Sequence, residues 1–453
     1  MKLFPYQEIG RDWLLKERFR LLADGMGLGK SAQAITAIPA NAKNVLIICP
    51  AVVRSNWLNE IRMWGDDKLT AQVLYKKQRG LPEVNVVIVS YDFAAMHTEL
   101  LTTRYWDVLV LDEAHMLKSL DAKRARAVFG KNGICRHANF IWALTGTPAP
   151  NYINDLWILL YSFGATTLLY DQFVDYYCTG YLFTKCFPSR FVVTGHKPER
   201  MKEIKAMIDP IMLRRQMEQV LDEVPTISFH DVVVDAGEID LNADDKFMEY
   251  VREGRLGDLD VKLELERKLL QQILDGNGAS TNIIEALKMV AKGIATLHRY
   301  SGLQKVQPVV ELVNQELESG AYEKIVIFAV HRNVVEGLRQ QLSQWNPVTV
   351  YGGTDPKKVE KRIASFQNDK RTRVFIGNIQ SAGTGITLTA SSEILMVETN
   401  YVPADIMQAI HRVRRIGQTK HVRARIVSLS NSIDQKINEI VRKKAAELSE
   451  IFD

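Results

Sequence analysis

Short runs of apolar, largely β-branched residues recur in the first and last thirds of this 453-residue chain. Such runs are typical of strands that are buried on both faces of a parallel sheet. Helical stretches such as residues 55–64 lie between them. The runs are VLIICP (45–50), VVIVSY (86–91), DVLVLDE (107–113), KIVIFAV (324–330), PVTVYGG (347–353), RVFIGN (373–378), EILMVE (393–398) and RARIVSL (423–429). The sequence therefore predicts an α/β fold in two parts, each with its own sheet.

The middle third of the chain has a different pattern, with charged helical sequence at residues 258–272 and 281–299 and one strand-like run, ISFHDVVV (227–234). A final amphipathic stretch covers residues 432–452 and predicts a helix that packs on the second sheet. The expected division is a first lobe over residues 1–215, with a helical and hairpin insertion at 155–210, a connector over 216–236, a helical protrusion over 237–300, and a second lobe over 301–453 that ends in this helix.

The composition excludes membrane-spanning and secreted proteins. Hydrophobic residues make up 46% of the chain, but no run approaches the roughly 18 apolar residues of a membrane span. The opening residues, MKLFPYQEIGRDW, lack the apolar core of a secretory signal. We therefore expect an intracellular protein that has no membrane partner. The net charge of +5 permits nucleic-acid binding without requiring it.

The segment DGMGLGKS (24–31) predicts a phosphate-binding loop between a strand and a helix. Its glycines, Gly25, Gly27 and Gly29, would let the backbone approach phosphate oxygens. Lys30 would reach the terminal phosphates of ATP, and Ser31 would hold Mg²⁺. Asp24 occupies the first glycine position of the strict pattern, as in a helicase variant of this loop. A glycine-rich loop with a purely structural role is the alternative.

DEAH (112–115) follows an apolar run, so its carboxylates should lie at the carboxyl end of a strand, where open α/β sheets bind ligands. Asp112 is the candidate Mg²⁺ ligand, and Glu113 is the candidate group that polarises the attacking water. Near the chain start, the amide of Gln7 could pair with both edges of adenine and select ATP; an ordinary polar residue at a helix start is the alternative.

QAIHRVRRIGQ (408–418) supplies the matching groups from the second part of the chain. Pro403 suits a helix start and Gly417 a helix end. In one continuous helix, Gln408, Arg412 and Arg415 share a face, as expected of groups that reach a γ-phosphate across a cleft. A solvated basic helix would have the same pattern.

Taken together, the chain resembles the Swi/Snf-type ATPases, which are double-stranded-DNA translocases of helicase superfamily two. Further segments that carry the resemblance are CPAVVRSNWLNEI (49–61), VSYD (89–92), LTGTP (144–148), MLRR (212–215) with VP (224–225), SAGTGITLTA (381–390) and RRIGQ (414–418). The resemblance implies two RecA-like lobes with family-specific helical insertions, and ATP with Mg²⁺ as cofactors. It also implies that Gly385 contacts the nucleotide.

Three segments are most similar to the small annealing-helicase branch, which rewinds DNA and remodels stalled forks. They are YYC (176–178), GLQK (302–305) and ETNYVPADIMQA (398–409). Met217 and Arg414 depart from the family pattern, which often has lysine and histidine there. The motifs begin and end near the chain ends, so we expect a bare motor of phage or bacterial origin.

The candidate nucleic-acid contacts lie at loop ends that should face one groove, and a walking motor should contact mainly phosphates. They are Arg54, Ser90, Tyr91 and Lys118 on the first half, and Arg332, Gly353, Thr354, Gln380, Ser381 and Thr384 on the second. The basic run 118–126 is equally well explained as a solvated helix face.

Residues 176–197 interleave aromatic and basic side chains, so they predict a hairpin that either stacks on junction bases or packs into the insertion.

The resemblance therefore implies an ATP hydrolase that moves on duplex, forked or four-way DNA in replication, recombination or repair. We expect a monomer, with a replication or recombination protein as recruiting partner. It would act in the cytoplasm of a bacterial or phage-infected cell, or in the nucleus of a eukaryote. An RNA helicase is disfavoured by MLRR and RIGQ. An ATP-gated DNA clamp with little turnover is disfavoured by Glu113, Arg412 and Arg415.

Overall fold

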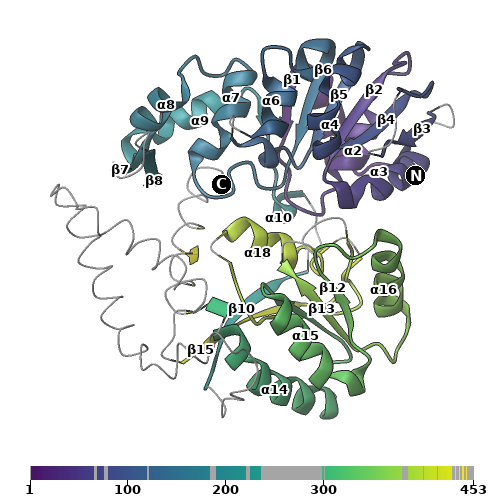
Figure 1. Ribbon diagram of the computed structural model, residues 1–453, viewed down its shortest axis with the longest axis vertical. Helices are drawn as coiled ribbons and strands as arrows, with labels where there is room; N and C mark the ends of the chain where they lie inside the picture. Colours follow the sequence, from purple (N-terminus) through teal and green to yellow (C-terminus); the bar gives the residue numbers. More distant parts are fainter. Residues whose placement is uncertain are drawn as a thin grey trace.

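The computed structural model places two α/β lobes one above the other, with helix α18 on the side of the second lobe that faces the first (Figure 1). The structure describes residues 2–65, 69–75, 80–119, 122–183, 190–220, 225–235, 298–299, 301–379, 386–400, 402–415 and 417–430, together with residues 434, 438, 441, 442 and 445.

The first lobe is built on a parallel sheet that has seven strands among the described residues. Strand β2 shows why the apolar runs form such a sheet. Its Leu46 and Ile48 enter one hydrophobic cluster, and its Val45 and Ile47 enter another on the opposite face, as the two-residue period of a strand requires. Across the sheet the strands are β3 (Ala71–Val73), β4 (Val86–Ser90), β2 (Val45–Cys49), β5 (Trp106–Asp112), β6 (Ala138–Leu144), β1 (Phe19–Leu22) and β9 (Met212–Leu213).

Helices cover this sheet, and a hairpin extends from the far end of the lobe (Figure 1). The helices are α1 (Pro5–Leu14), α2 (Lys30–Thr36), α3 (Arg54–Trp64), α4 (Tyr91–Met96), α5 (Thr98–Thr102), α6 (Lys123–Phe129), α7 (Trp157–Ser162), α8 (Tyr170–Tyr177) and α9 (Met201–Ile208). The antiparallel hairpin pairs β7 (Cys178–Phe183) with β8 (Arg190–His196). The hairpin predicted within residues 176–197 is therefore present, although its tip at 184–189 lies outside the described residues. Phe191 packs against the core of the first lobe, and Lys197 donates to the Asp175 carbonyl at 2.6 Å.

The second lobe repeats the design with a parallel sheet that has six strands in the described part of the chain. In order they are β10 (Ile227–Val234), β15 (Val422–Leu429), β14 (Glu393–Met396), β11 (Ile325–Ala329), β13 (Val374–Asn378) and β12 (Val348–Val350). Alternate residues of β11 again enter clusters on opposite faces of the sheet. The helices are α10 (Met217–Val220), α14 (Val306–Glu318), α15 (Arg332–Gln341), α16 (Pro356–Asn368) and α18 (Pro403–Ile410).

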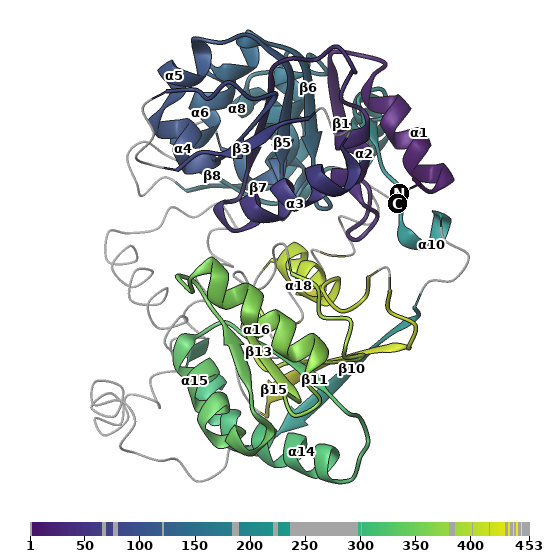
Figure 2. The ribbon, with the colours of Figure 1, turned by 90° about the vertical axis from the view of Figure 1, so that its right-hand side faces the viewer.

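The chain crosses between the lobes through a short segment that is integrated into both sheets (Figure 2). Strand β9 pairs with β1 of the first sheet, and β10 pairs with β15 of the second. Helix α10 lies between them. The second half of the segment expected as a connector is therefore already a strand of the second sheet. The expected protrusion at 237–300 lies outside the described residues, apart from positions 298 and 299.

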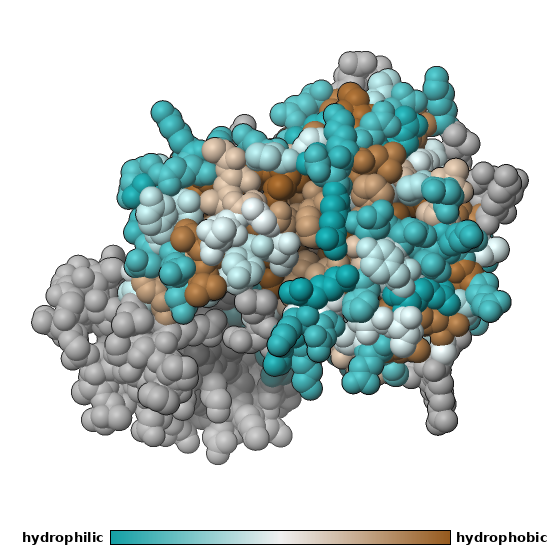
Figure 3. All heavy atoms as spheres, turned by 90° about the horizontal axis from the view of Figure 1, so that it is seen from above, coloured by the Kyte–Doolittle hydropathy of each residue, from teal (hydrophilic) through white to brown (hydrophobic). Residues whose placement is uncertain are grey.

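The surface at the end formed by the first lobe mixes hydrophilic and hydrophobic side chains (Figure 3). Among the described helices, none combines the length and apolar character needed to cross a lipid bilayer.

The structure confirms the predicted α/β fold with two parallel sheets. All eight apolar runs that were read as strands of these sheets contain one. Strand β1 is the strand expected before the phosphate loop, whereas β3, β6 and β9 were not predicted, and two of these three have only two or three residues. The final helix expected at 432–452 falls almost wholly outside the described residues.

A buried ion pair in the second lobe gives a first prediction. Lys305 and Asp434 are 1% and 4% exposed, and the Lys305 Nζ lies 2.7 Å from Asp434 Oδ2. Lys305→Met should cost about 3–5 kcal/mol of unfolding free energy, because the carboxylate stays buried without its cation. The exposed pair Arg371–Asp369 is the control, and Arg371→Met should cost less than about 1 kcal/mol in denaturant unfolding. Equal effects of the two substitutions would contradict this account.

Candidate active site

The glycine-rich loop joins β1 to α2 and requires glycine at two positions. Gly27 and Gly29 have φ angles of 85° and 72°, which residues with a Cβ rarely adopt. A Cβ on Gly29 would also lie 2.4 Å from the Nε2 atom of Gln7. The loop therefore has the conformation and the close packing expected of a phosphate cradle.

Asp24, at the position that departs from the strict pattern, is completely buried and anchors the loop to the connector. Arg215 of MLRR binds its carboxylate through two nitrogens, with Nε–Oδ1 at 2.9 Å and Nη2–Oδ2 at 2.5 Å. Gln33 of α2 donates to the same carboxylate at 3.1 Å, and Arg215 also donates to the carbonyl oxygen of Tyr6. A bidentate, charge-assisted pair of this kind fixes both position and orientation.

Lys30 begins α2, and its Nζ donates to the carbonyl oxygens of Asp24 and Gly25 at 2.8 and 3.3 Å. Burial lowers the pKa of Lys30, and the negative charge of Glu113 opposes that shift. Ser31 is the second residue of the same helix. The lysine therefore lies over the loop, close to the carboxylates of DEAH.

The DEAH carboxylates lie at the carboxyl end of β5. Asp112 Oδ1 accepts from the backbone N–H of Glu113 at 3.0 Å, and Oδ2 accepts from the indole N–H of Trp57 at 2.7 Å. Burial, and then the neighbouring charge of Glu113, raise the pKa of Asp112 to about 7. Glu113 itself has a φ of 51°, a conformation that is uncommon without glycine and is often found at functional sites.

His115 links DEAH to LTGTP. Its Nδ1 lies 3.0 Å from the Thr145 hydroxyl and 3.4 Å from Glu113 Oε2. The loop after β6 is thereby connected to the candidate catalytic carboxylate through one imidazole.

Three candidate residues of the second lobe meet this site across the gap. Gln408 Nε2 donates to Glu113 Oε1 at 3.1 Å. Arg412 is 9% exposed, and its Nε has no hydrogen-bond partner among the described residues. Burial, and then the neighbouring positive charge of Arg415, lower the pKa of Arg412 to about 10. Arg415 donates to the Thr387 hydroxyl at 3.1 Å.

The prediction that one continuous helix carries these three residues is wrong, because the helix is shorter than expected. Helix α18 ends at Ile410, and Arg412 and Arg415 lie in the turns that follow. The carbonyl oxygen of Arg412 accepts from the backbone N–H of Leu388, so it is drawn out of a helical pattern by a neighbouring segment. The arginines reach the site from a turn, not from one helical face.

Gln7 is 3% exposed, and its amide is engaged by backbone groups. Its Nε2 donates to the Leu28 carbonyl at 3.2 Å, and its Oε1 accepts from the Phe4 N–H at 3.0 Å. It therefore connects α1 to the phosphate loop, and its pairing with adenine stays a prediction.

The residues present fit ATP with Mg²⁺. Buried Arg412 and half-buried Lys30 and Arg415 bring positive charges from both lobes toward one loop, and burial lowers the pKa of each. Buried cations are unfavourable unless an anion pairs with them. No cluster of three or more His, Cys, Asp or Glu side chains in the described part of the chain could hold a metal by itself. Mg²⁺ would therefore be held by Asp112 and Ser31 together with the phosphates.

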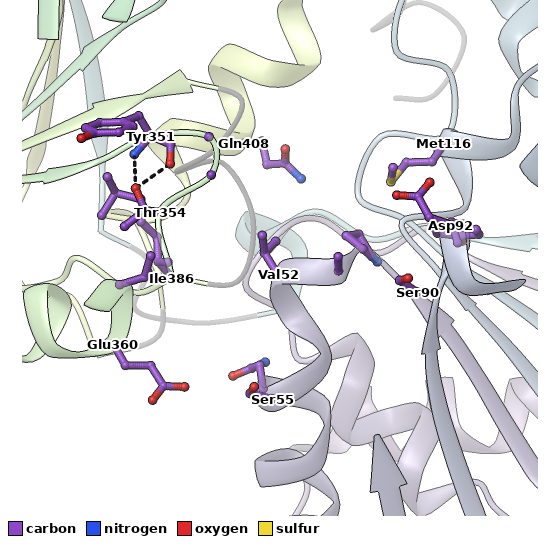
Figure 4. A pocket seen from close by; sticks show the side chains of 18 of the residues that line it. Val52, Ser55, Ser90, Asp92, Met116, Tyr351, Thr354, Glu360, Ile386 and Gln408 are labelled. Atoms are coloured by element: carbon purple, nitrogen blue, oxygen red, sulfur yellow. Dashed lines mark hydrogen bonds between the residues drawn. The ribbon is translucent and has the colours of Figure 1, made fainter. Parts of the chain in front are cut away.

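A cleft of about 570 Å³ runs between the lobes beside this site and is lined by both (Figure 4). Ser55, Ser90 and Asp92 line it from the first lobe, opposite Tyr351 and Thr354 of the second. The candidate nucleic-acid contacts Ser90, Tyr91, Gly353 and Thr354 all line this cleft. The Thr354 hydroxyl donates to the Tyr351 carbonyl at 2.7 Å, which fixes the loop that Gly353 occupies with a φ of 84°.

Other candidate contacts are already engaged within the protein. Arg54 donates to the carbonyl oxygens of Ala51 and Leu74 and lies 4.8 Å from the ring centre of Tyr75. Lys118 lies 3.6 Å from Asp155, and Arg332 lies 4.8 Å from the ring centre of Tyr351. The remaining candidates, Gln380, Ser381, Thr384 and Gly385, lie outside the described residues.

Comparison with known families decides the assignment, because residues 6–243 match the SNF2-related domain. The chain belongs to the SNF2-related family. Residues 304–417 match the helicase conserved C-terminal domain, so both lobes are those of an SNF2-family helicase-like ATPase. The first match covers every strand of the first sheet and also β10 of the second, and the second match covers β11 to β14 but not β15.

Several curated relatives align with nearly the whole chain. A Caenorhabditis elegans homolog of the SWI/SNF-related matrix-associated actin-dependent regulator of chromatin subfamily A-like protein 1 is 26% identical over 99% of this chain and 62% of its own length. The Mus musculus DNA annealing helicase and endonuclease ZRANB3 is 25% identical over 98% of this chain and 40% of its own length. The chain thus spans 40 to 62% of the length of these relatives.

Among solved structures, the Sulfolobus solfataricus SWI2/SNF2 ATPase core in complex with dsDNA is 23% identical, with a TM-score of 0.44. That alignment covers 98% of this chain and 92% of the other.

Sequence reasoning missed the residues that hold the candidate groups of this SNF2-related site in place. Asp24 was noticed only as a departure from a pattern, and MLRR only as a family signature, yet Asp24 and Arg215 form one ion pair. Trp57 and Thr145 were not selected either. Their partners lie 30 to 191 positions away along the chain, so no local pattern reveals the contacts. The charged residue at a glycine position was the one available signal.

Asp24→Gly gives a second prediction, because it restores the strict loop pattern and yet should impair the site. The substitution leaves the Arg215 guanidinium without its carboxylate, which should cost about 3–5 kcal/mol of stability and raise the KM for ATP. Thermal unfolding and steady-state hydrolysis are the measurements. Asp12→Ala, which removes the carboxylate of the exposed pair with Arg11, should cost less than about 1 kcal/mol. An Asp24→Gly variant that matches the wild type would sink this account.

Proposed function

We propose that this chain is an ATP-driven translocase on double-stranded DNA that remodels branched or forked DNA in replication, recombination or repair. The observation that carries the proposal is the hydrogen bond from Gln408 to Glu113. It joins a side chain of the second lobe to the candidate catalytic carboxylate of the first, so closure of the lobes and assembly of the site are one event. Hydrolysis that requires closure can drive relative motion of the lobes.

The site residues have separable roles in this proposal. Glu113 accepts a proton from, or orients, the attacking water. Gln408 holds one oxygen of its carboxylate, and His115 lies 3.4 Å from the other. Lys30, Arg412 and Arg415 stabilise the charge that develops on the transferred phosphoryl group. Mg²⁺, when bound, neutralises phosphate charge. The turn that carries Arg412 and Arg415 is held by the backbone bond from Leu388 to Arg412.

The cleft between the lobes is the proposed DNA path. It is lined by residues of both lobes, including Ser55, Asn56, Gly353 and Thr354. Contacts from such residues to DNA phosphates do not depend on the base sequence. An enzyme that moves along DNA requires contacts of this kind. Binding should therefore weaken as salt rises, with a slope set by the number of phosphates contacted.

Fork or junction remodelling is the finer part of the proposal. It is supported by the name of the ZRANB3 relatives, which describes a DNA annealing helicase, and by GLQK and ETNYVPADIMQA. In the structure, a Cβ on Gly302 of GLQK would lie 2.1 Å from Glu398 Oε1, so these two segments are tightly packed. The hairpin β7–β8 is the candidate junction contact. A phage or bacterial origin, the cellular compartment and a recruiting partner stay predictions.

The deciding experiment measures ATP hydrolysis with single-stranded, duplex, forked and four-way DNA and with RNA. We expect duplex-containing DNA to stimulate hydrolysis, and forks or junctions to stimulate it most. Lys30→Ala and Glu113→Gln should each lower the rate by about 10² to 10⁴, and chelation of Mg²⁺ should abolish it. Glu113→Gln should still bind DNA.

Lys16→Ala and Glu17→Gln change the same residue types at exposed positions and should hydrolyse ATP at the wild-type rate. Stimulation by RNA alone would overturn the proposal. DNA binding without turnover in the wild type would favour an ATP-gated clamp, and equal stimulation by every DNA would remove the fork-specific part.

A further inference from the structure

The indole of Trp57 connects the wall of the interlobe cleft to the carboxylate of Asp112. Trp57 is 1% exposed, and its Nε1 donates to Asp112 Oδ2 at 2.7 Å. It lies on α3, which also presents Ser55 and Asn56 to the cleft. An indole nitrogen donates and a carboxylate oxygen accepts, so the contact holds the carboxylate against α3.

Tyr91 makes a second connection from a different element. Its side chain is 2% exposed, and its hydroxyl donates to the carbonyl oxygen of Asp112 at 2.7 Å. Tyr91 begins α4 directly after Ser90, whose hydroxyl caps that helix at the edge of the cleft. Figure 4 shows Ser55 and Ser90 on the same wall, facing Tyr351. Two elements of this wall therefore contact one aspartate.

The remaining oxygen of Asp112 is held from the other side, since Oδ1 accepts from the backbone N–H of Glu113 at 3.0 Å. Each carboxylate oxygen keeps a second lone pair that can bind a metal. The position of this carboxylate, and of Glu113 beside it, is thus set jointly by α3, α4 and the turn after β5.

We propose that Trp57 and Tyr91 are positioning residues through which DNA in the cleft sets the geometry of Asp112. The inference rests on the proposed function, which places DNA in the cleft and the nucleotide at the phosphate loop. A phosphate contact at Ser55 would displace α3 slightly, and the Trp57 hydrogen bond would pass this displacement to Asp112. A contact at Ser90 would act in the same way through α4 and the Tyr91 hydrogen bond. The same bonds pass a change at Asp112 back to the cleft.

The competing explanation is that Trp57 only fills the core, because it belongs to the hydrophobic cluster on its face of the sheet. A packing role predicts lower stability when the ring is changed. It does not predict a change in how DNA and nucleotide affect each other. Coupling free energy is reciprocal between two ligands, so it can be measured by binding alone, without turnover.

The test compares the Kd of a fluorescently labelled DNA duplex, by anisotropy, with and without saturating Mg²⁺ and a non-hydrolysable ATP analogue. For the wild type we expect a ratio of about 5- to 150-fold, the usual range of coupling. Trp57→Phe keeps an aromatic ring and removes the donor, and it should bring the ratio to within about twofold of one. Its Kd for DNA without nucleotide should stay close to that of the wild type.

Trp142→Phe is the matched control. Trp142 is 0% exposed, lies in the same cluster as Trp57, and its Nε1 has no hydrogen-bond partner among the described residues. The substitution changes the same atoms in the same core without touching Asp112, so it should keep the wild-type ratio. Tyr91→Phe removes only a hydroxyl and should lower the ratio as Trp57→Phe does, so the test stands even where Trp57→Phe fails to fold.

The failures of the two proposals are distinguishable. A wild-type ratio near one would overturn the proposed DNA-coupled motor and this inference with it. A wild-type ratio well above one that survives in Tyr91→Phe and in folded Trp57→Phe would overturn this inference alone. Equal losses in Trp57→Phe and Trp142→Phe would assign the effect to packing and would also overturn it.

Discussion

The buried ion pair between Asp24 and Arg215 is the contact on which the rest of the site depends. A carboxylate without exposed surface is tolerated only when it is paired, so the phosphate loop is tied to the start of the connector. Met217, two residues further, packs against Tyr6 and Leu28 beside the same loop. The connector then enters the second sheet as β10. A rotation of the second lobe would therefore act through the connector on the phosphate loop, at the Asp24–Arg215 ion pair.

The charges at the site explain why the two lobes should respond to an anion. Lys30 comes from the first lobe and Arg412 and Arg415 from the second, and burial lowers the pKa of each. These cations are less favourable together in a dry interface than in water. A bound anion offsets this penalty fully only when both lobes contribute cations to it. It therefore interacts more favourably with the closed arrangement of the lobes than with the open one, and it favours closure. The Gln408–Glu113 hydrogen bond forms in the same arrangement.

Sequence reasoning was successful where the physics is local. The runs around β2, β5 and β11 predict buried parallel strands because each face of such a strand meets its own core. It failed where a distant contact overrides a local preference. Arg412 leaves the expected helix because its carbonyl is taken by Leu388. Trp57 looks unremarkable locally, and the pattern around Asp24 and Arg215 does not show that they pair, because their roles come from partners in other elements.

The two departures from the Swi/Snf pattern belong to one contact between the lobes. Met217 is 2% exposed in the apolar cluster beside the phosphate loop, where a lysine would place a charge among apolar side chains. Its neighbour Glu218 accepts from Arg414, which also donates to the Pro225 carbonyl at 2.8 Å. A histidine at 414 is shorter and carries no fork of donors, so it could not hold both acceptors. Helix α10 is therefore fixed to the first lobe by an apolar contact and to the second by a charged one.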